Sequence, residues 1–452
     1  MNDDTNLPGV VIALDEAEMA KRFAIMLSRR HQSRFRVNRC IIRRTRHRSG
    51  RRAIVEYELE LVDTRGHFIS VYWLTASIYS SKDASLLAKK VCRDVNDQNH
   101  IAFPFLPAEA ITDLNILVQP FPFDRRLPGL TEMFTLTADS CCARDLVFAL
   151  FGEHWSPIDV RTLVARYRAG LAAVLKYSIV AQNNRTSQRE IRVAFAKVFR
   201  NTEAVRQNAS SLRKLRNHVQ AVGVVKPVCC VDSAAALVLA ETPGRTLADV
   251  LLTESCDIID AEVRRVAKAL AKFNQEPTIF AREPSNSQHH ESLVRSCKQL
   301  CKAAPGLTKR IERAMNLASQ AETVAKGTVH GDLKLEHVFV SPGEIHLIDW
   351  DSYSSRDPVS DPAMLMVRIF AHGIEHGGST ANFQRTVDQF CAAYFSAVPP
   401  AWAKRLASQF AMAVIEVSHS YYRRRESCWF TLAKGLIDQA ERMGTKSPVA
   451  TA

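Results

Sequence analysis

The sequence predicts an α+β protein whose first half is rich in strands and whose second half is helical. A strand–strand–strand–helix pattern occurs twice, and its corresponding residues are 120 positions apart. Beyond residue 245, apolar residues recur at three- and four-residue spacing, which is typical of amphipathic helices. A chain of 452 residues is too long for one small hydrophobic core, so several domains are expected.

The first occurrence of the pattern is expected to form a domain over residues 1–140. It contains a predicted helix, three strands and a second helix, in the order 14–29, 39–44, 53–62, 67–79 and 84–95. The letters DTRG before the third strand supply the turn chemistry of a hairpin. Several prolines between residues 102 and 130 predict an irregular connection to the next domain.

The second occurrence, within residues 141–244, predicts a duplication. RHRSGRRAIVEYELE from Arg46 aligns with RYRAGLAAVLKYSIV from Arg166, with five identical positions. The same offset places Ser77 over Lys197, so only the second copy keeps a lysine on its third strand. We therefore interpret the first copy as a degenerate version of the second.

The third domain, residues 245–452, follows a Pro-Gly break in AETPGRTL that is typical of a hinge. Helices are predicted at 263–273, 291–303, 307–325, 361–375, 380–396, 400–420 and 427–442. Between the third and fourth of them lies one predicted hairpin, TVHGDLKLEHVFVSPGEIHLIDWD, residues 328–351. This short segment holds most of the candidate chemistry.

Composition and charge exclude several classes of protein. No apolar run is long enough to span a membrane, and the acidic N-terminus does not resemble a secretory signal, so a cytoplasmic protein without membrane contact is expected. The eleven cysteines show no CxxC pair, which favours reduced core thiols over zinc or disulfides.

The net charge of +13 is concentrated in residues 29–52, which hold eleven arginines and no acidic residue. This segment could bind nucleic acid or another polyanion, or it could be the solvated face of two strands. Because apolar residues alternate with the arginines, the solvated face is favoured and nucleic acid is not an expected partner.

In the hairpin, a turn at Pro342-Gly343 would place Val340 opposite Ile345 and bring His337 and Asp349 to the same open end. Asp332 enters just upstream. Gathered carboxylates repel one another unless a cation lies between them, and hard divalent cations prefer carboxylate oxygens. A metal on phosphates together with one free acid is the arrangement that phosphoryl transfer requires.

These residues resemble a known family. HGDLKLEHVF followed by LIDWDSYSSRDPVSDPA is similar to the signature of the aminoglycoside phosphotransferase and choline kinase-like family, which includes maltokinase-type members with an extra N-terminal domain. The resemblance implies a protein-kinase-like fold of two lobes. Residues 141–244 would be the β-rich N-lobe, 245–452 the helical C-lobe with the catalytic hairpin, and 1–140 a cap built from a degenerate N-lobe.

By the same resemblance, Asp332 corresponds to the catalytic base that accepts the proton of the substrate hydroxyl. Asp349 corresponds to the metal-binding acid, with Asp351 as an auxiliary acid, and His337 stands where the family pattern has the asparagine that contacts a second metal. Asp357 and Asp361 would be structural, holding the helix that follows them.

The nucleotide side of the resemblance falls in the second domain. Lys197 corresponds to the strand lysine that pairs with nucleotide phosphates, and the hinge that receives adenine includes Glu241 and Thr242. Gly170 in RYRAGLAAV is the one usable glycine of the phosphate loop. The helix glutamate that normally pairs with the lysine is missing, with Glu203 as the nearest substitute.

The resemblance implies an enzyme: an ATP-dependent phosphotransferase acting on a hydroxyl of a small molecule, with ATP and Mg²⁺ or Mn²⁺. A sugar, polyol or similar metabolite is expected rather than an aminoglycoside, because a basic chain is a poor host for polycations. The alternative is a catalytically retired pseudokinase that binds nucleotide or acts as a scaffold, since His337 and the missing glutamate depart from the pattern. An RNA-associated kinase is a third possibility.

Overall fold

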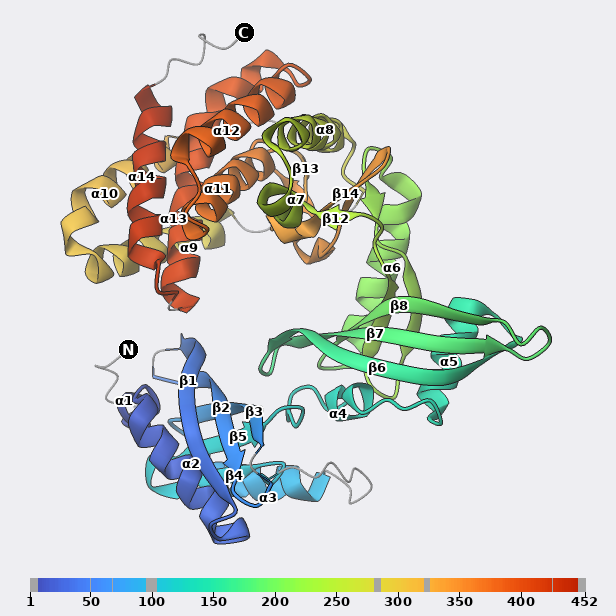
Figure 1. Ribbon diagram of the computed structural model, residues 1–452. Coiled ribbons are helices and arrows are strands. Elements are labelled where there is room, and N and C mark those ends of the chain that lie inside the picture. The colour runs from blue at the N-terminus through green and yellow to red at the C-terminus, as the bar shows by residue number, and fades with distance from the viewer. Residues whose placement is uncertain are drawn as a thin grey trace. The chain divides into compact units, whose positions relative to one another are not determined.

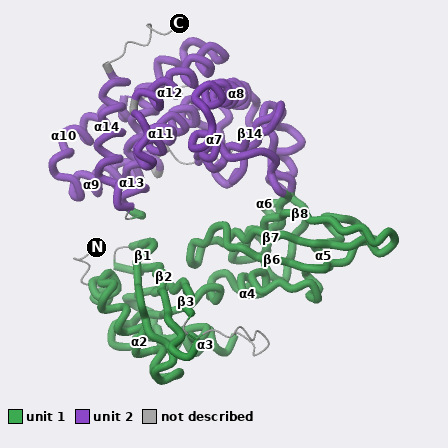
Figure 2. The backbone as a smooth tube through the Cα atoms, in the orientation of Figure 1, with its two compact units in different colours: residues 1–209, 227–240, 423–425 green, residues 210–226, 241–422, 426–452 purple. Residues whose placement is uncertain are grey.

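The computed structural model describes residues 7–48, 50–66, 68–94, 104–279, 286–320, 326–424 and 426–445. The chain forms two compact units (Figure 2). Unit 1 contains residues 1–209, 227–240 and 423–425, and unit 2 contains 210–226, 241–422 and 426–452. Residues 1–140 and most of residues 141–244 therefore belong to unit 1, whereas 210–226 and 241–244 belong to unit 2. The expected boundaries at residues 140 and 244 remain predictions.

The first sheet of unit 1 has the strand order β1-β2-β3-β5-β4. Its strands are β1 (Phe35–Arg48), β2 (Arg52–Asp63), β3 (Ile69–Tyr79), β4 (Glu109–Ile111) and β5 (Ile116–Pro120). Helix α2 (Glu16–His31) begins where the Asp15 side chain accepts a hydrogen bond from the Glu18 amide, and it lies across one face of the sheet (Figure 1). Phe23 of α2 packs edge-on against the buried ring of Tyr57, which places the core between helix and sheet.

The second sheet of unit 1 repeats this order, β6-β7-β8-β11-β10. Its strands are β6 (Trp155–Arg168), β7 (Ala172–Asn183), β8 (Arg189–Val198), β10 (Pro227–Val231) and β11 (Ala236–Ala240). Helix α5 (Cys141–Phe151) precedes it, as α2 precedes the first sheet, and α6 (Thr202–His218) occupies the place of α3 (Ala84–Asp94). Fully buried Tyr177 corresponds to Tyr57, and both hydroxyls donate to a backbone carbonyl, that of Tyr57 to Ala13 and that of Tyr177 to Met133.

The duplication predicted from the sequence extends across both sheets. Ser77 pairs with Leu117 in the first sheet, and Lys197 pairs with Leu237 in the second, which is the same register displaced by 120 residues. The turns after β1 and β6 also agree, because Gly50 and Gly170 both adopt left-handed backbone angles, with φ of 66° and 64°. The two sheets are thus copies of one unit.

The prediction of an irregular connection over 102–130 is wrong for part of that stretch. It contains strands β4 and β5, which complete the first sheet. Residues 101–103 lie outside the described residues. The prolines suggested a break, but Pro104 and Pro107 precede β4 and Pro120 is the last residue of β5, so none interrupts the ladder.

Unit 2 is mainly helical, as predicted. Its helices are α7 (Leu247–Thr253), α8 (Cys256–Gln275), α9 (Asn286–Ala303), α10 (Thr308–Ser319), α11 (Ser360–Glu375), α12 (Thr380–Phe395), α13 (Leu406–Arg424) and α14 (Trp429–Thr445). Helix α10 ends earlier than expected, and residues 321–325 of that prediction lie outside the described part. Helix α11 is buried along most of its length, which fits its largely apolar sequence.

Two small sheets bring the hairpin into this helical unit. The larger has the order β12-β14-β15-β9, with β9 (Gly223–Val224), β12 (Arg245–Thr246), β14 (Val338–Ser341) and β15 (Glu344–Leu347). The smaller pairs β13 (Gly327–Val329) with β16 (Ser354–Arg356). The predicted α+β class is confirmed, with β-rich and helical parts and an additional N-terminal copy. No helix among the described residues combines the length and apolar character needed to cross a membrane.

Candidate functional site

The hairpin has the predicted register. Val340 pairs with Ile345, and the amide of Ile348 donates to the carbonyl of His337 at 3.1 Å. The turn residue Gly343 has a φ of 84°, which suits the left-handed position after a proline in a Pro-Gly turn. His337 and Asp349 consequently lie close together at the open end of the hairpin, as the sequence predicted.

The hairpin brings three metal-ligating side chains together. Ligand atoms of Asp332, His337 and Asp349 all lie within 4.8 Å of one another. His337 Nε2 is 3.6 Å from Asp349 Oδ2, and the His337 side chain is 5% exposed. Asp332 is the open member, with 44% of its side chain exposed. Asp351 is exposed and outside this group.

The imidazole of His337 is oriented for ligation. Its Nδ1 lies 2.9 Å from the backbone carbonyl of Asp332, so Nδ1 carries the proton and donates it. Nε2 is then the acceptor and faces Asp349. Burial, with help from the charge of Lys334, lowers the pKa of His337 to about 4, so the ring is neutral near pH 7.

The backbone at Asp349 is unusual. Its φ of 65° and ψ of 54° place a non-glycine residue in the left-handed region. The next residue, Trp350, is buried and its ring packs 5.1 Å from that of His330. His330 is itself fully buried and lies 2.9 Å through Nε2 from the Ile348 carbonyl. These contacts hold the strained residue in place.

Asp361 supports the loop that carries Asp332. Its carboxylate is 2% exposed and accepts hydrogen bonds from the amides of His330 at 2.7 Å and Gly331 at 3.0 Å. Asn274 donates to the same carboxylate at 3.3 Å. The sequence predicted a structural role for Asp361 at its own helix, and the structure shows that its side chain reaches back to the loop two residues before Asp332.

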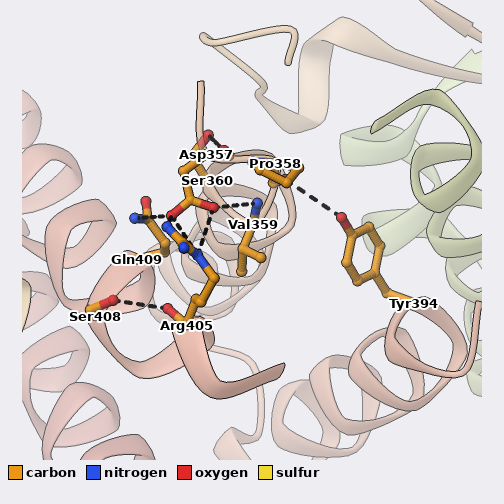
Figure 3. Close-up of polar contacts among 8 residues, drawn as sticks. All are labelled: Asp357, Pro358, Val359, Ser360, Tyr394, Arg405, Ser408 and Gln409. Carbon is orange, nitrogen blue, oxygen red and sulfur yellow. Dashed lines mark hydrogen bonds and ion pairs between the residues drawn. The ribbon is translucent and has the colours of Figure 1, made fainter. Parts of the chain in front are cut away.

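Asp357 joins the start of α11 to α13 (Figure 3). Its carboxylate accepts from Arg405 Nε at 3.1 Å, from Arg405 Nη2, from Gln409 and from the amide of Val359. The side chains of Arg405 and Asp357 are 10% and 15% exposed. The backbone carbonyl of Asp357 also accepts from the hydroxyl of Ser360, the first residue of α11, so Asp357 tethers the start of this helix without being its N-cap.

Lys334 is a functional candidate that the sequence reasoning missed. Its ammonium lies 2.6 Å from Asp332 Oδ2, and 17% of its side chain is exposed. The signal was present, because a lysine two residues after the candidate base can reach the same carboxylate. It places a positive charge next to the group expected to face the acceptor.

The remaining predicted residues are distributed over both units. Lys197 lies on β8 in unit 1, with its ammonium 5.6 Å from the centre of the Phe199 ring. Glu203 accepts a hydrogen bond from Gln207 at 2.6 Å. Glu241 and Thr242 follow β11 at the start of the main segment of unit 2, the first exposed and the second buried.

The chain thus combines β-sheets, a helical unit and the cluster of Asp332, His337 and Asp349. The model of the phosphotransferase enzyme family matches residues 180–406, which is half of the chain. The chain therefore belongs to this family, and the resemblance inferred from its motifs is confirmed. No curated protein sequence matches the chain.

The chain is also similar in structure to two antibiotic phosphotransferases and a protein of the choline/ethanolamine kinase family. A thermostable aminoglycoside phosphotransferase mutant bound to AMP-PNP and hygromycin B is 14% identical, with a TM-score of 0.43, and the match covers 68% of this chain and 100% of that one. Macrolide 2'-phosphotransferase MphH from Brachybacterium faecium is 15% identical, with a TM-score of 0.40 and coverage of 66% and 98%. A choline/ethanolamine kinase family protein from Mesorhizobium loti is 12% identical, with a TM-score of 0.37 and coverage of 60% and 85%.

Proposed function

We propose that the protein is an ATP-dependent kinase that phosphorylates a hydroxyl group of a small molecule. The observation that carries the proposal is the cluster of Asp332, His337 and Asp349, because its donor atoms converge within 4.8 Å on the hairpin of a phosphotransferase family member. Membership in the family supports transfer of a phosphoryl group, and the cluster supports retention of the chemistry in this chain.

The donor set fits a divalent cation. Asp349 and His337 offer a carboxylate oxygen and the unprotonated Nε2 of a neutral imidazole, with the Asp332 carboxylate within 4.8 Å of both. When bound, the cation would neutralise charge on the nucleotide phosphates. Mn²⁺ accepts imidazole more readily than Mg²⁺ does, so a site with His337 in place of asparagine favours Mn²⁺.

Asp332 is proposed to accept the proton of the attacking hydroxyl. It is the exposed member of the cluster, which leaves one oxygen open to an acceptor. Lys334 holds the other oxygen at 2.6 Å and would place its charge next to the phosphoryl group in transit. Asp361 fixes the backbone of His330 and Gly331, so the base is presented from a rigid loop.

Nucleotide binding is proposed for Lys197, Glu241 and Thr242. Lys197 would pair with phosphates from the middle of the second sheet, and the backbone of the two following hinge residues would receive the adenine. Asp351 would act as an auxiliary acid from the exposed turn after Asp349.

A sugar, polyol or similar hydroxyl compound is proposed as the acceptor. Glu416 of α13 lies 3.4 Å from His289, and burial raises the pKa of its carboxyl while the charges of His289, Arg356 and Arg368 oppose that shift. A carboxyl group on this helix can hydrogen-bond hydroxyl groups. We also propose that the enzyme acts in the cytoplasm.

The test is ATP consumption across a panel of sugars, amino alcohols and aminoglycosides with Mg²⁺ or Mn²⁺, alongside ATP binding by calorimetry. Turnover with one acceptor, abolished by Asp332→Asn without loss of ATP binding, is the expected result. Metal-dependent ATP binding without turnover on any acceptor would favour a pseudokinase. Absence of ATP binding would refute the proposal.

A further inference from the structure

The turn between β6 and β7 is held by side chains that bond to the backbone of Ala169 and Gly170. Ala169 donates its amide to Glu56 Oε1 at 3.2 Å, and its carbonyl accepts from Arg46. Gly170 donates its amide to Asp124, and its carbonyl accepts from Arg200 Nε at 2.9 Å. The four backbone polar groups of these two residues therefore each have a side-chain partner.

Most of these partners come from outside the second copy. Glu56 and Arg46 belong to β2 and β1 of the first sheet, 3.6 Å apart as an ion pair, and their side chains are only 13% and 19% exposed. Asp124 belongs to the connection between the two copies and also accepts from the hydroxyl of Tyr167 at 3.0 Å. Side chains of the N-terminal copy thus hydrogen-bond to the β6–β7 turn of the second copy.

The face of the first sheet that carries Glu56 corresponds to the face of the second sheet that carries Lys197, the residue proposed to bind nucleotide phosphates. The other face of the first sheet packs on α2 through Tyr57 and its neighbours. Glu56 and Ser77 point away from that core, and at the 120-residue offset they correspond to Lys176 and Lys197. The cavity that remains among Ser77, Gln119, Ala169 and Gly170 is about 20 Å³, room for about one water molecule.

A turn fixed in this way is organised before any ligand arrives. Gly170 is the one glycine of the turn and has a left-handed φ of 64°, a conformation that would otherwise be one of several open to it. Ordering a free turn on binding would lower affinity, whereas a turn already ordered avoids that cost. Charge-assisted bonds to carboxylates are strong enough to impose such order.

We propose that Glu56 and Asp124 are positioning residues for nucleotide binding: they hold the amides of Ala169 and Gly170 so that the β6–β7 turn is fixed in shape above the phosphates. This inference rests on the proposed function, since it assigns the turn to the nucleotide site. It gives the N-terminal copy a role in the reaction although that copy has no lysine at the position of Lys197.

The experiment compares Glu56→Gln and Asp124→Asn with wild type in the full chain. Each variant keeps the shape of its side chain but removes the charge that holds an amide. We expect the Kd for ATP to rise roughly tenfold, because a hydrogen bond to a charged group contributes on that scale. Backbone hydrogen exchange at residues 168–171 in the absence of ATP should become faster, while the KM of the acceptor stays unchanged.

Glu58→Gln is the matched control. Glu58 lies two residues along the same strand, paired with exposed Arg43 at 3.1 Å, and has no contact with the turn among the described residues. Its ATP affinity and exchange should equal those of wild type. Should Glu56→Gln fail to fold by circular dichroism, Asp124→Asn decides, because Asp124 lies outside both sheets.

The failures are distinguishable. Wild-type protein that binds no ATP would refute the proposed function and this inference with it. Wild-type protein that binds ATP, with charge-neutral variants that bind equally well, would overturn only the inference. Tighter binding by the variants would overturn it as well, since it would mean that the two carboxylates compete with phosphate for the amides.

Discussion

Asp357→Ala tests how the structure around α11 is held together. The change removes the carboxylate that pairs with Arg405 and leaves a guanidinium that is 10% exposed without its counter-ion. The Nη1 atom of Arg405 already has no hydrogen-bond partner among the described residues, so the side chain has little to replace the lost contacts. The amide of Val359 and the side chain of Gln409 lose an acceptor as well.

The expected loss of folding stability can be estimated from these contacts. Removing one partner of a buried ion pair typically destabilises a protein by about 3–5 kcal/mol, because the remaining charge stays buried. An exposed pair contributes about 0–1 kcal/mol. Arg313→Ala is therefore the control, since Arg313 is 67% exposed where it meets Glu441 at 3.4 Å.

Urea denaturation followed by far-ultraviolet circular dichroism measures both variants. We expect a large fall in the unfolding midpoint for Asp357→Ala and almost none for Arg313→Ala, with similar slopes. A loss below about 1 kcal/mol for Asp357→Ala would refute the reasoning, because it would place this pair in the surface class. The double variant Asp357→Leu with Arg405→Met should recover much of the loss, since it leaves no charge buried.

Four further outcomes are expected. Asp332→Asn should keep ATP binding and lower the transfer rate by about 10²- to 10⁴-fold, as loss of a general base does, and a wild-type rate with a verified acceptor would contradict the role. Lys197→Ala should weaken ATP binding or slow transfer while Ser77→Ala in the first copy has no effect; the reverse pattern would mean that the wrong copy was assigned to the nucleotide. His337→Asn should shift the metal preference from Mn²⁺ towards Mg²⁺ without abolishing transfer, measured as rate against each metal, and equal responses in both proteins would place His337 outside the metal shell. If the arginines of 29–52 bind a polyanion, affinity for single-stranded RNA should fall linearly on a log–log plot against salt concentration. No binding at about 50 mM salt would mean that these arginines only form the solvated face of two strands.

The candidate site could be predicted from sequence where it depends on local geometry. A two-residue turn fixes which residues of a hairpin oppose each other, so the meeting of His337 and Asp349 followed from the position of Pro342-Gly343 alone. The duplication could be predicted for the same reason, because three strands and their turns kept one spacing throughout.

The parts that were missed depend on contacts between distant residues. Nothing in the sequence indicated that Asp361 would bond to amides thirty residues upstream, since a helix cap explains the same residue equally well. Strands β4 and β5 were missed because they are short, flanked by prolines and ordered by pairing, β5 with β3 and β4 with β5. Lys334 was missed because its importance depends on reaching Asp332, which spacing allows but does not require.

At Asp349, the residue that would best stabilise the left-handed backbone is not the residue that the proposed activity needs. A side chain held in that conformation costs on the order of 1 kcal/mol, which glycine would avoid. A stabilisation campaign guided only by backbone preference would therefore choose glycine there and discard the carboxylate. Screens for thermostable variants of this chain should keep residue 349 fixed, because the substitution that most eases the fold at this point removes one of the three groups that meet at the hairpin's open end.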